Sequence, residues 1–89
     1  MGNKTDLVKF LELNKYNLDL VNLKQADLQG ADLRGAKLQE ANLQGVDFTE
    51  AKLQVSCLEW ADLRGAKLFR ANLRGAKLQD AKLRGAYLA

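Results

Sequence analysis

The residues that could do chemistry are few in this chain, and their types exclude most enzyme mechanisms. The 89 residues contain no histidine and a single cysteine, Cys57. Without histidine the chain lacks the commonest general base, the nucleophile pairs that depend on it and most zinc sites. Cys57 lies in the block "SCLEW", which has no basic residue to activate the thiol, so we interpret it as inert. We therefore expect no catalytic, cofactor-binding or metal-binding residue, and no cofactor.

Binding is the remaining kind of chemistry, and it depends on which side chains the fold brings together. The chain has 14 Lys and Arg against 11 Asp and Glu, a net charge of +3. This excess is slight for a nucleic-acid binder, and few aromatic residues are available to stack on bases. The elements that hold these charges must be found first.

A five-residue repeat runs from Tyr16 to the end of the chain, in blocks such as "ADLRG" and "ANLQG". The central residue of each block is Leu, except for Phe48, and the residue two places earlier is mostly Ala. In an α-helix five steps rotate the side chain by about 140°, so no apolar stripe forms. In a strand an odd period sends successive leucines to opposite faces. The chain must instead turn a corner once in each block, with Leu and the small residue inside.

Glycine indicates how many sides each coil has. It closes alternate blocks, with Gly30 as the one exception, at Gly35, Gly45, Gly65, Gly75 and Gly85. The true period is therefore ten, which favours an even number of sides, and four is the smallest closed solution. We predict positive φ at the glycine corners, as in type II turns, whereas the other corners must accept side chains.

At this point the blocks resemble the motif A(D/N)LXX of the pentapeptide-repeat family, over about residues 16–88. The resemblance implies an all-β solenoid, a right-handed quadrilateral β-helix of about four coils that occupies residues 16–89. Lys replaces the usual Asp or Asn in five blocks, and "VSCLEW" departs most, which predicts a locally irregular coil. Such repeats are abundant in cyanobacteria. Some members imitate the charge of duplex DNA and inhibit topoisomerase, but that role requires a strongly acidic rod, and this chain is short and basic.

Residues 1–15 have no five-residue pattern and predict a short capping α-helix over the first coil. Thr5 is the expected N-cap, and Leu7, Phe10, Leu11 and Asn14 lie along one helical face. A membrane-surface helix is the weaker alternative, because the charges are mixed. The last residues, "AKLRGAYLA", offer no cap, so Leu83, Leu88 and unpaired backbone should be exposed. Either end-to-end association or a longer parent chain would explain this.

The outward positions offer two candidate binding surfaces. Aromatic and apolar residues make a candidate protein interface at Trp60, Phe69, Tyr87 and Leu88. Trp60 has an alternative, in which an irregular coil tucks it against a corner. Basic residues gather on two opposed sides as candidate stripes, Lys24, Arg64 and Arg84 on one and Arg34 and Arg74 on the other. These stripes either meet phosphates or form an ordinary solvated face, and Asp62 lies close enough to relieve the repulsion around Arg64.

The function expected from the sequence is a non-catalytic, rigid scaffold or protein–protein interaction module. The expected partner is a protein, including a second copy through the C-terminal coil. The alternative is anion or nucleic-acid binding through the basic stripes. No signal peptide or membrane-spanning segment is visible, and one cysteine suits a reducing compartment, so we expect a cytoplasmic location and no membrane partner.

Overall fold

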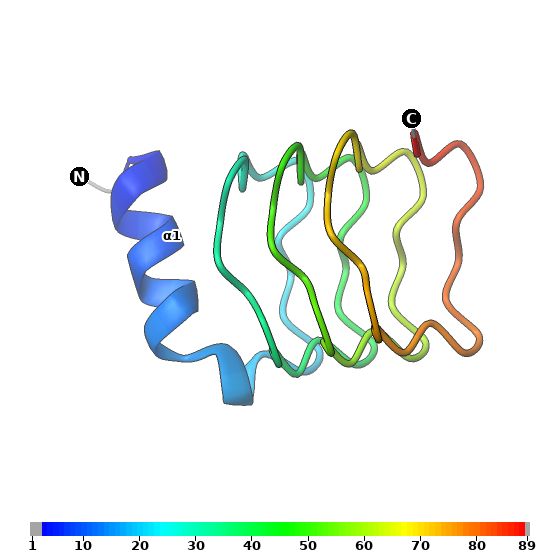
Figure 1. Cartoon of the computed structure of the whole chain (residues 1–89), viewed down its shortest axis with the longest axis horizontal. Coiled ribbons are helices and arrows are strands. Elements are labelled where there is room, and N and C mark those ends of the chain that lie inside the picture. The colour runs from blue at the N-terminus through cyan, green and yellow to red at the C-terminus, as the bar shows by residue number, and fades with distance from the viewer. Residues whose placement is uncertain (1–2, 89) are drawn as a thin grey trace.

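The computed structural model describes residues 3–88, in which a helix is followed by a stack of coils (Figure 1). The helix α1 spans Lys4–Leu13, and a short 3-10 helix, η1, spans Lys15–Asn17. Parallel β-bridges then join residues twenty apart, from Asn22 with Asn42 to Lys67 with Tyr87. Twenty residues are four blocks, so the prediction of four sides is confirmed. Every bridge is isolated, and residues 3–88 contain no longer strand.

Each block turns its corner through its fourth and fifth residues. The first residue of the next block donates its N–H to the carbonyl of the preceding central residue, as Ala26 does to Leu23 at 2.9 Å. The fifth residue has positive φ at every corner, at six glycines and at eight other residues, with values from 53° to 73°. This is the geometry of a type II turn. The positive φ predicted at the glycine corners is confirmed, but it is not confined to them, since Trp60 adopts 62° where Gly65 adopts 70°. Each non-glycine corner carries a strain of about 1 kcal/mol that the surrounding ladder must hold.

The second residue of each block explains the Asp or Asn of the motif. Its side-chain oxygen accepts the backbone N–H of the fourth residue, as Asn22 does from Lys24 at 3.1 Å and Asp62 from Arg64 at 3.2 Å. This bond satisfies a donor at the corner, where the chain leaves the ladder. A lysine has no acceptor atom, so the five blocks with Lys at this position give up the bond.

The core consists of the first and third residues of the blocks, as the sequence predicts. The central leucines from Leu28 to Leu63 are at most 1% exposed, and Phe48, the largest fully buried residue, is 0% exposed. Residues 56–60 follow the same pattern, because Ser56 is buried and Cys57 bridges to Lys37 and Lys77. The prediction of an irregular coil at "VSCLEW" is therefore wrong, since the small Ser56 takes the place of alanine without disturbing the turn.

Replacing Ser56 by alanine is expected to stabilise the fold. The Ser56 hydroxyl is buried and has no hydrogen-bond partner within residues 3–88. Alanines occupy the equivalent place one coil before and after, at Ala36 and Ala76, so the smaller side chain fits. Removing an unsatisfied buried hydroxyl should raise the free energy of unfolding by about 1 kcal/mol. Urea denaturation checks this, and a lower midpoint for Ser56→Ala would show that the hydroxyl is hydrogen-bonded in solution.

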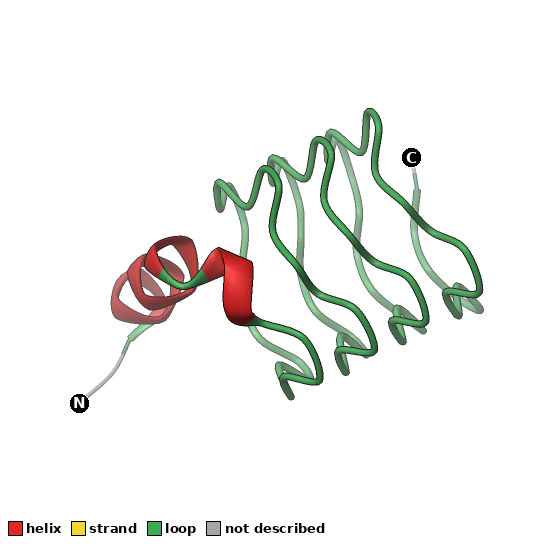
Figure 2. Cartoon of the chain, turned by 90° about the horizontal axis from the view of Figure 1, so that it is seen from below, coloured by secondary structure: helices red, strands yellow, loops and turns green. Residues whose placement is uncertain are grey.

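Helix α1 covers one end of the coil stack, as expected of a cap (Figures 1 and 2). Leu11 is its buried residue, and Leu7 and Val8 are partly buried against the core. Two details of the prediction are wrong. The N-cap is Asn3, whose side chain accepts the Asp6 N–H at 2.9 Å, so the helix begins before Thr5. Phe10 is 58% exposed, because only one turn of the helix reaches the core.

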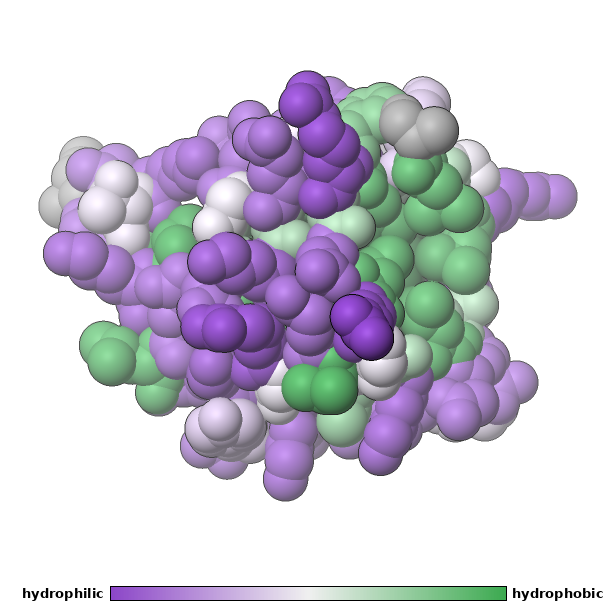
Figure 3. All heavy atoms as spheres, viewed as in Figure 1, coloured by the Kyte–Doolittle hydropathy of each residue, from purple (hydrophilic) through white to green (hydrophobic). Residues whose placement is uncertain are grey.

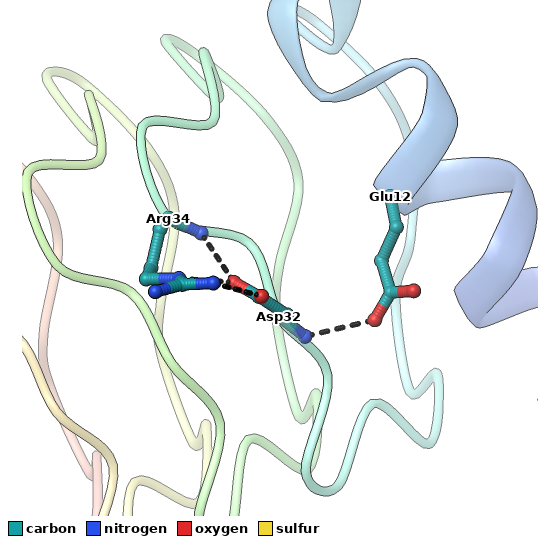
Figure 4. A network of polar contacts seen from close by, with 3 residues as sticks. All are labelled: Glu12, Asp32 and Arg34. Atoms are coloured by element: carbon teal, nitrogen blue, oxygen red, sulfur yellow. Dashed lines mark hydrogen bonds and ion pairs between the residues drawn. The ribbon is translucent and has the colours of Figure 1, made fainter.

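Two groups near the end of α1 accept the backbone N–H groups that a preceding coil would otherwise accept. The N–H of Asp32 donates to Glu12 Oε2 at 2.9 Å (Figure 4). The N–H of Lys37 donates to the carbonyl of Lys15 at 2.7 Å. Elsewhere the same backbone position donates to the coil before it, as Asp62 does to Ala41. The cap therefore satisfies edge hydrogen bonds as well as covering apolar surface.

The opposite end of the stack is apolar on its outside. Leu83 is 38% and Leu88 65% exposed, and Figure 3 shows hydrophobic atoms gathered over the end far from α1. Within residues 3–88 the N–H groups of Leu73, Leu78 and Leu83 have no backbone acceptor. The expected exposure of Leu83, Leu88 and unpaired backbone is confirmed for these residues.

Candidate functional site

No constellation for metal chemistry is present in the described part of the chain. Residues 3–88 contain no group of three or more Cys, Asp or Glu placed to hold a metal ion. Cys57 is half-buried, and its ladder neighbours are Lys37 and Lys77. The sequence did not reveal these lysines, because each lies twenty residues away. None of the helices between residues 3 and 88 has the length and apolar character needed to cross a membrane.

A hollow of about 600 Å³ lies between α1 and the first coil, and it opens to solvent. Its walls come from the first turns of the helix and from the first coil, namely Asn3, Lys4, Asp6, Leu7 and Asp27. Since only Leu11 of α1 is buried, this hollow reflects the loose fit of the cap, and it brings none of the predicted site residues together.

The ladder places the predicted basic residues along two corners of the stack. Since residues twenty apart lie over one another, Lys24, Arg64 and Arg84 share one corner. Arg34 and Arg74 share the diagonally opposite corner, which is reached two blocks later. The sorting into two opposed groups is as predicted, although the groups occupy corners rather than flat sides.

Two of these arginines are already paired with carboxylates. Arg34 donates from Nε to Asp32 Oδ1 at 2.8 Å and from Nη2 to Oδ2 at 2.6 Å (Figure 4). Arg64 makes the same two bonds to Asp62, at 2.8 and 2.5 Å. The expectation that Asp62 relieves Arg64 is therefore confirmed. The basic corners carry less free positive charge than the sequence suggests, with Lys24, Arg74 and Arg84 outside any ion pair within residues 3–88.

These pairs lower the pKa values of both carboxyls. The hydrogen bond from the Arg34 side chain lowers the pKa of Asp32 from 3.8 to about 2, and burial opposes it. The Arg64 side chain lowers the pKa of Asp62 in the same way. The arginine pKa values rise correspondingly, because each guanidinium donates to a carboxylate.

As the pH falls, the free energy of unfolding of the wild type should therefore decrease more steeply than that of a variant that lacks the two carboxylates. A carboxyl whose pKa is depressed in the folded state stabilises the fold above its unfolded value near 3.8. That contribution is lost as the pH falls from about 4 to about 2, and for exposed pairs it is about 1 kcal/mol at most. Asp32→Asn/Asp62→Asn keeps the oxygen that caps the corner, as Asn42 does for Gln44 at 3.2 Å. The urea midpoint of the wild type should exceed that of the double variant at pH 5, and the difference should shrink at pH 2.5. An equal difference at both pH values would contradict the assignment.

The predicted apolar residues are placed in different environments. Trp60 is 64% exposed at its corner, so the alternative in which it is tucked away is wrong. Phe69 is half-buried rather than free, because its ring packs on Tyr87 with centroids 5.8 Å apart. Tyr87 and Leu88 are exposed, as predicted. The structure brings Phe69 and Tyr87 together and leaves Trp60 apart from them, on another corner.

One corner is acidic, and the sequence analysis missed it. Its fourth and fifth residues bring Asp19, Glu40, Glu59 and Asp80 to one edge on four successive coils, alternately in the fourth and the fifth position, with Leu20 and Trp60 among them. We call these six residues the acidic corner. None of its carboxylates belongs to an ion pair within residues 3–88, and Glu59 Oε1 is buried there without a hydrogen-bond partner. The twenty-residue period carried the signal, but it becomes visible only when the fourth and the fifth residues of the blocks are considered together.

Comparisons with known proteins agree with this architecture. A family model for pentapeptide repeats matches residues 17–54 and 56–89 in eight copies. No curated protein matches the chain. Among solved structures it is similar to HetL, a pentapeptide repeat protein involved in heterocyst differentiation regulation from the cyanobacterium Nostoc, with 37% identity and a TM-score of 0.54 over 79% of this chain and 37% of HetL.

Two further structures extend the comparison. The chain is similar to QnrB1, a plasmid-mediated fluoroquinolone resistance protein, with 20% identity and a TM-score of 0.51 over 81% of this chain and 42% of QnrB1. That likeness shows the fold alone. A pentapeptide repeat protein of the Arabidopsis thaliana thylakoid lumen has 31% identity and a TM-score of 0.48, over 81% of this chain and 53% of its own. This chain therefore spans between 37% and 53% of the length of these three proteins.

Proposed function

The chain belongs to the pentapeptide-repeat family, and from this premise we propose that it is a non-catalytic, rigid scaffold, wound right-handed like that family, that binds another protein. One observation carries the proposal. Large apolar side chains stand on the outside of a fold whose interior is already filled, with Trp60 64%, Tyr87 53% and Leu88 65% exposed. Aromatic residues in such places are typical anchors of protein interfaces.

The regular backbone supports this function physically. Each coil donates its N–H groups to the next, as Leu53 does to Asn72 and Val55 to Arg74, so outward side chains stand on fixed positions. A surface that is ordered before binding loses little conformational entropy when a partner arrives. HetL is described as taking part in the regulation of differentiation, a role compatible with binding rather than turnover. The cytoplasmic location expected from the sequence stays a prediction.

A comparison of surface variants tests the proposal. Proteins retained from a lysate by the immobilised chain should be lost when Trp60→Ala and Tyr87→Lys are combined, because both side chains are exposed and their removal leaves the core intact. Gln29→Lys, also exposed but at another corner of the stack, is the matched control and should retain them. If the variant and the control retain the same proteins as the wild type, the apolar residues bind nothing and the proposal fails.

A second copy is one partner that this function includes, through the exposed C-terminal coil. Light scattering over a wide concentration range measures it directly on the 89-residue chain. A dimer that dissociates in Leu88→Lys supports self-association through Leu88, which is 65% exposed. A monomer at every concentration overturns this part of the proposal and leaves Trp60 as the anchor.

Anion or nucleic-acid binding through the basic corners is the second candidate. Lys24, Arg74 and Arg84 favour it, because they lie outside the ion pairs within residues 3–88. The pairing of Arg34 and Arg64 weakens it, since a guanidinium held by a carboxylate has fewer donors left for a phosphate. Charge reversal at Arg64 and Arg84 should reduce the salt dependence of any duplex binding, and an unchanged slope would exclude the basic corner.

A further inference from the structure

We propose that the acidic corner is the docking surface for a basic, arginine-containing segment of a partner protein, with Trp60 as its anchor. This inference rests on the proposed protein-binding function and specifies the chemistry of the partner. It uses a surface that comes into existence only when the chain is wound, since its residues lie twenty apart.

The ladder holds the residues of this corner in two neighbouring columns, formed by the fourth and the fifth residues of the blocks. Trp60 donates its N–H to the carbonyl of Gln79 at 3.0 Å, and Glu40 donates to the carbonyl of Glu59 at 3.0 Å. Successive coils are about 4.8 Å apart, so Trp60 stands between Glu40 and Asp80 within reach of one cation. Glu59 precedes Trp60 on the same turn. Three acidic residues therefore lie next to Trp60, one before it in the chain and one on each neighbouring coil.

The charge of this corner is opposite to that of the molecule. The chain as a whole carries +3, whereas Asp19, Glu40, Glu59 and Asp80 bring four negative charges to one edge. These carboxylates lie on successive coils in two neighbouring columns, and like charges gathered in this way repel one another unless a cation relieves them. Lysines stand on the adjacent sides, at Lys37, Lys77 and Lys82, but none of them pairs with these carboxylates within residues 3–88. The buried Glu59 Oε1 also lacks a donor there.

Trp60 indicates which cationic group of the partner this corner would bind. It contributes nothing to the core, being 64% exposed, and it takes a positive φ that six other corners assign to glycine. An indole flanked by carboxylates suits a guanidinium, which can stack on the ring and donate several hydrogen bonds in its plane. An ammonium group makes fewer such bonds, so arginine should bind more tightly than lysine.

A second copy of the chain is the competing occupant. Its own basic corner, with Arg84 and Lys24, is complementary in charge to the acidic corner. Such a contact joins different surfaces of the two copies, so repeating it would build rings or filaments. Filament growth with concentration would therefore overturn the assignment to a separate basic partner.

The single tryptophan makes the test direct. Because Trp60 is the only tryptophan, its fluorescence reports on this corner alone. We would titrate the 89-residue chain with a hexa-arginine peptide at low salt, and with hexalysine and hexaglutamate for comparison. The expected result is a saturable change with hexa-arginine, a weaker one with hexalysine and none with hexaglutamate. Glu40→Lys/Asp80→Lys should weaken hexa-arginine binding about tenfold or more.

Glu50→Lys is the matched control, because Glu50 is a fifth residue with positive φ at another corner. It should change the affinity about twofold at most, since its one ion pair within residues 3–88, with Arg70, is exposed and 3.8 Å long. Urea unfolding verifies that all variants fold. Equal affinity in every variant, or no saturable change, overturns the inference. If the combined Trp60→Ala and Tyr87→Lys variant still loses proteins from the lysate in that case, the protein-binding function stands and only the basic, arginine-containing partner is excluded.

Discussion

Leu63→Lys is expected to abolish the native fold. Leu63 is 1% exposed in the centre of the stack, and its N–H is fixed to the carbonyl of Lys82 at 2.8 Å. A lysine at this place would put an ammonium group among leucines with no carboxylate inside the coil. Burying an unpaired charge costs several kcal/mol at least, which is comparable with the whole stability of a small domain, about 5–15 kcal/mol. Circular dichroism and amide chemical-shift dispersion should both show an unfolded chain.

Gln79→Lys is the control for this prediction. It introduces the same side chain at an exposed fourth position, where the new charge stays in water. Its unfolding midpoint should differ little from that of the wild type, by about 0.5 kcal/mol or less. Equal tolerance of both substitutions would mean that the inward and outward positions are assigned wrongly.

The inward register could be predicted because the repeat leaves one physical solution. A leucine every five residues fits neither a helix nor a strand, so the corner in each block follows, and Leu63 and Ala61 must then share the interior. The corners were predicted less completely. Glycine suggested which turns have positive φ, but the ladder imposes the same φ on Trp60 and Glu40. Tertiary hydrogen bonds outweigh the local preference of the residue there.

The helical cap shows a different limit of the sequence. Asn3 and Thr5 are both good N-cap residues, so composition alone does not decide where α1 begins. The choice depends on the side-chain bond from Asn3 to the Asp6 N–H. The role of Glu12 was also missed, because its partner is the backbone N–H of Asp32, twenty residues later. Sequence periodicity identifies a helical face and does not tell how much of that face reaches the core.

Some of the candidate surfaces could be predicted from the sequence and others could not. The basic corners were predictable, because their members occupy one position of the repeat, and the pair of Arg64 with Asp62 lies within one block. The acidic corner combines the fourth residue of some blocks with the fifth of others, so it appears only when the turn is built. The contact between Phe69 and Tyr87 could not be predicted for a similar reason, because Tyr87 lies on the next coil and the two rings meet only in the folded chain.

Phe48→Ala is expected to produce the second-largest loss of stability. Phe48 is the one central residue that is not leucine, it is 0% exposed, and it is the largest fully buried residue. Truncating a buried phenylalanine to alanine costs about 3–5 kcal/mol, from lost apolar burial and from the cavity left behind. The coil should still fold at low temperature, because no charge is buried. Urea denaturation should give a midpoint far below that of the wild type with a similar slope.

Phe48→Leu separates the two contributions to that loss. Leucine occupies the equivalent place one coil before and after, at Leu28 and Leu68, so the turn and the ladder accept it. The block around Phe48 is also enlarged at Val46, which is buried where most blocks have alanine. The coil is therefore locally filled by bulkier side chains, and leucine should leave only a small cavity and cost about 1 kcal/mol. If Phe48→Leu costs as much as Phe48→Ala, the interior of this coil is shaped around the ring itself and cannot close over a smaller residue.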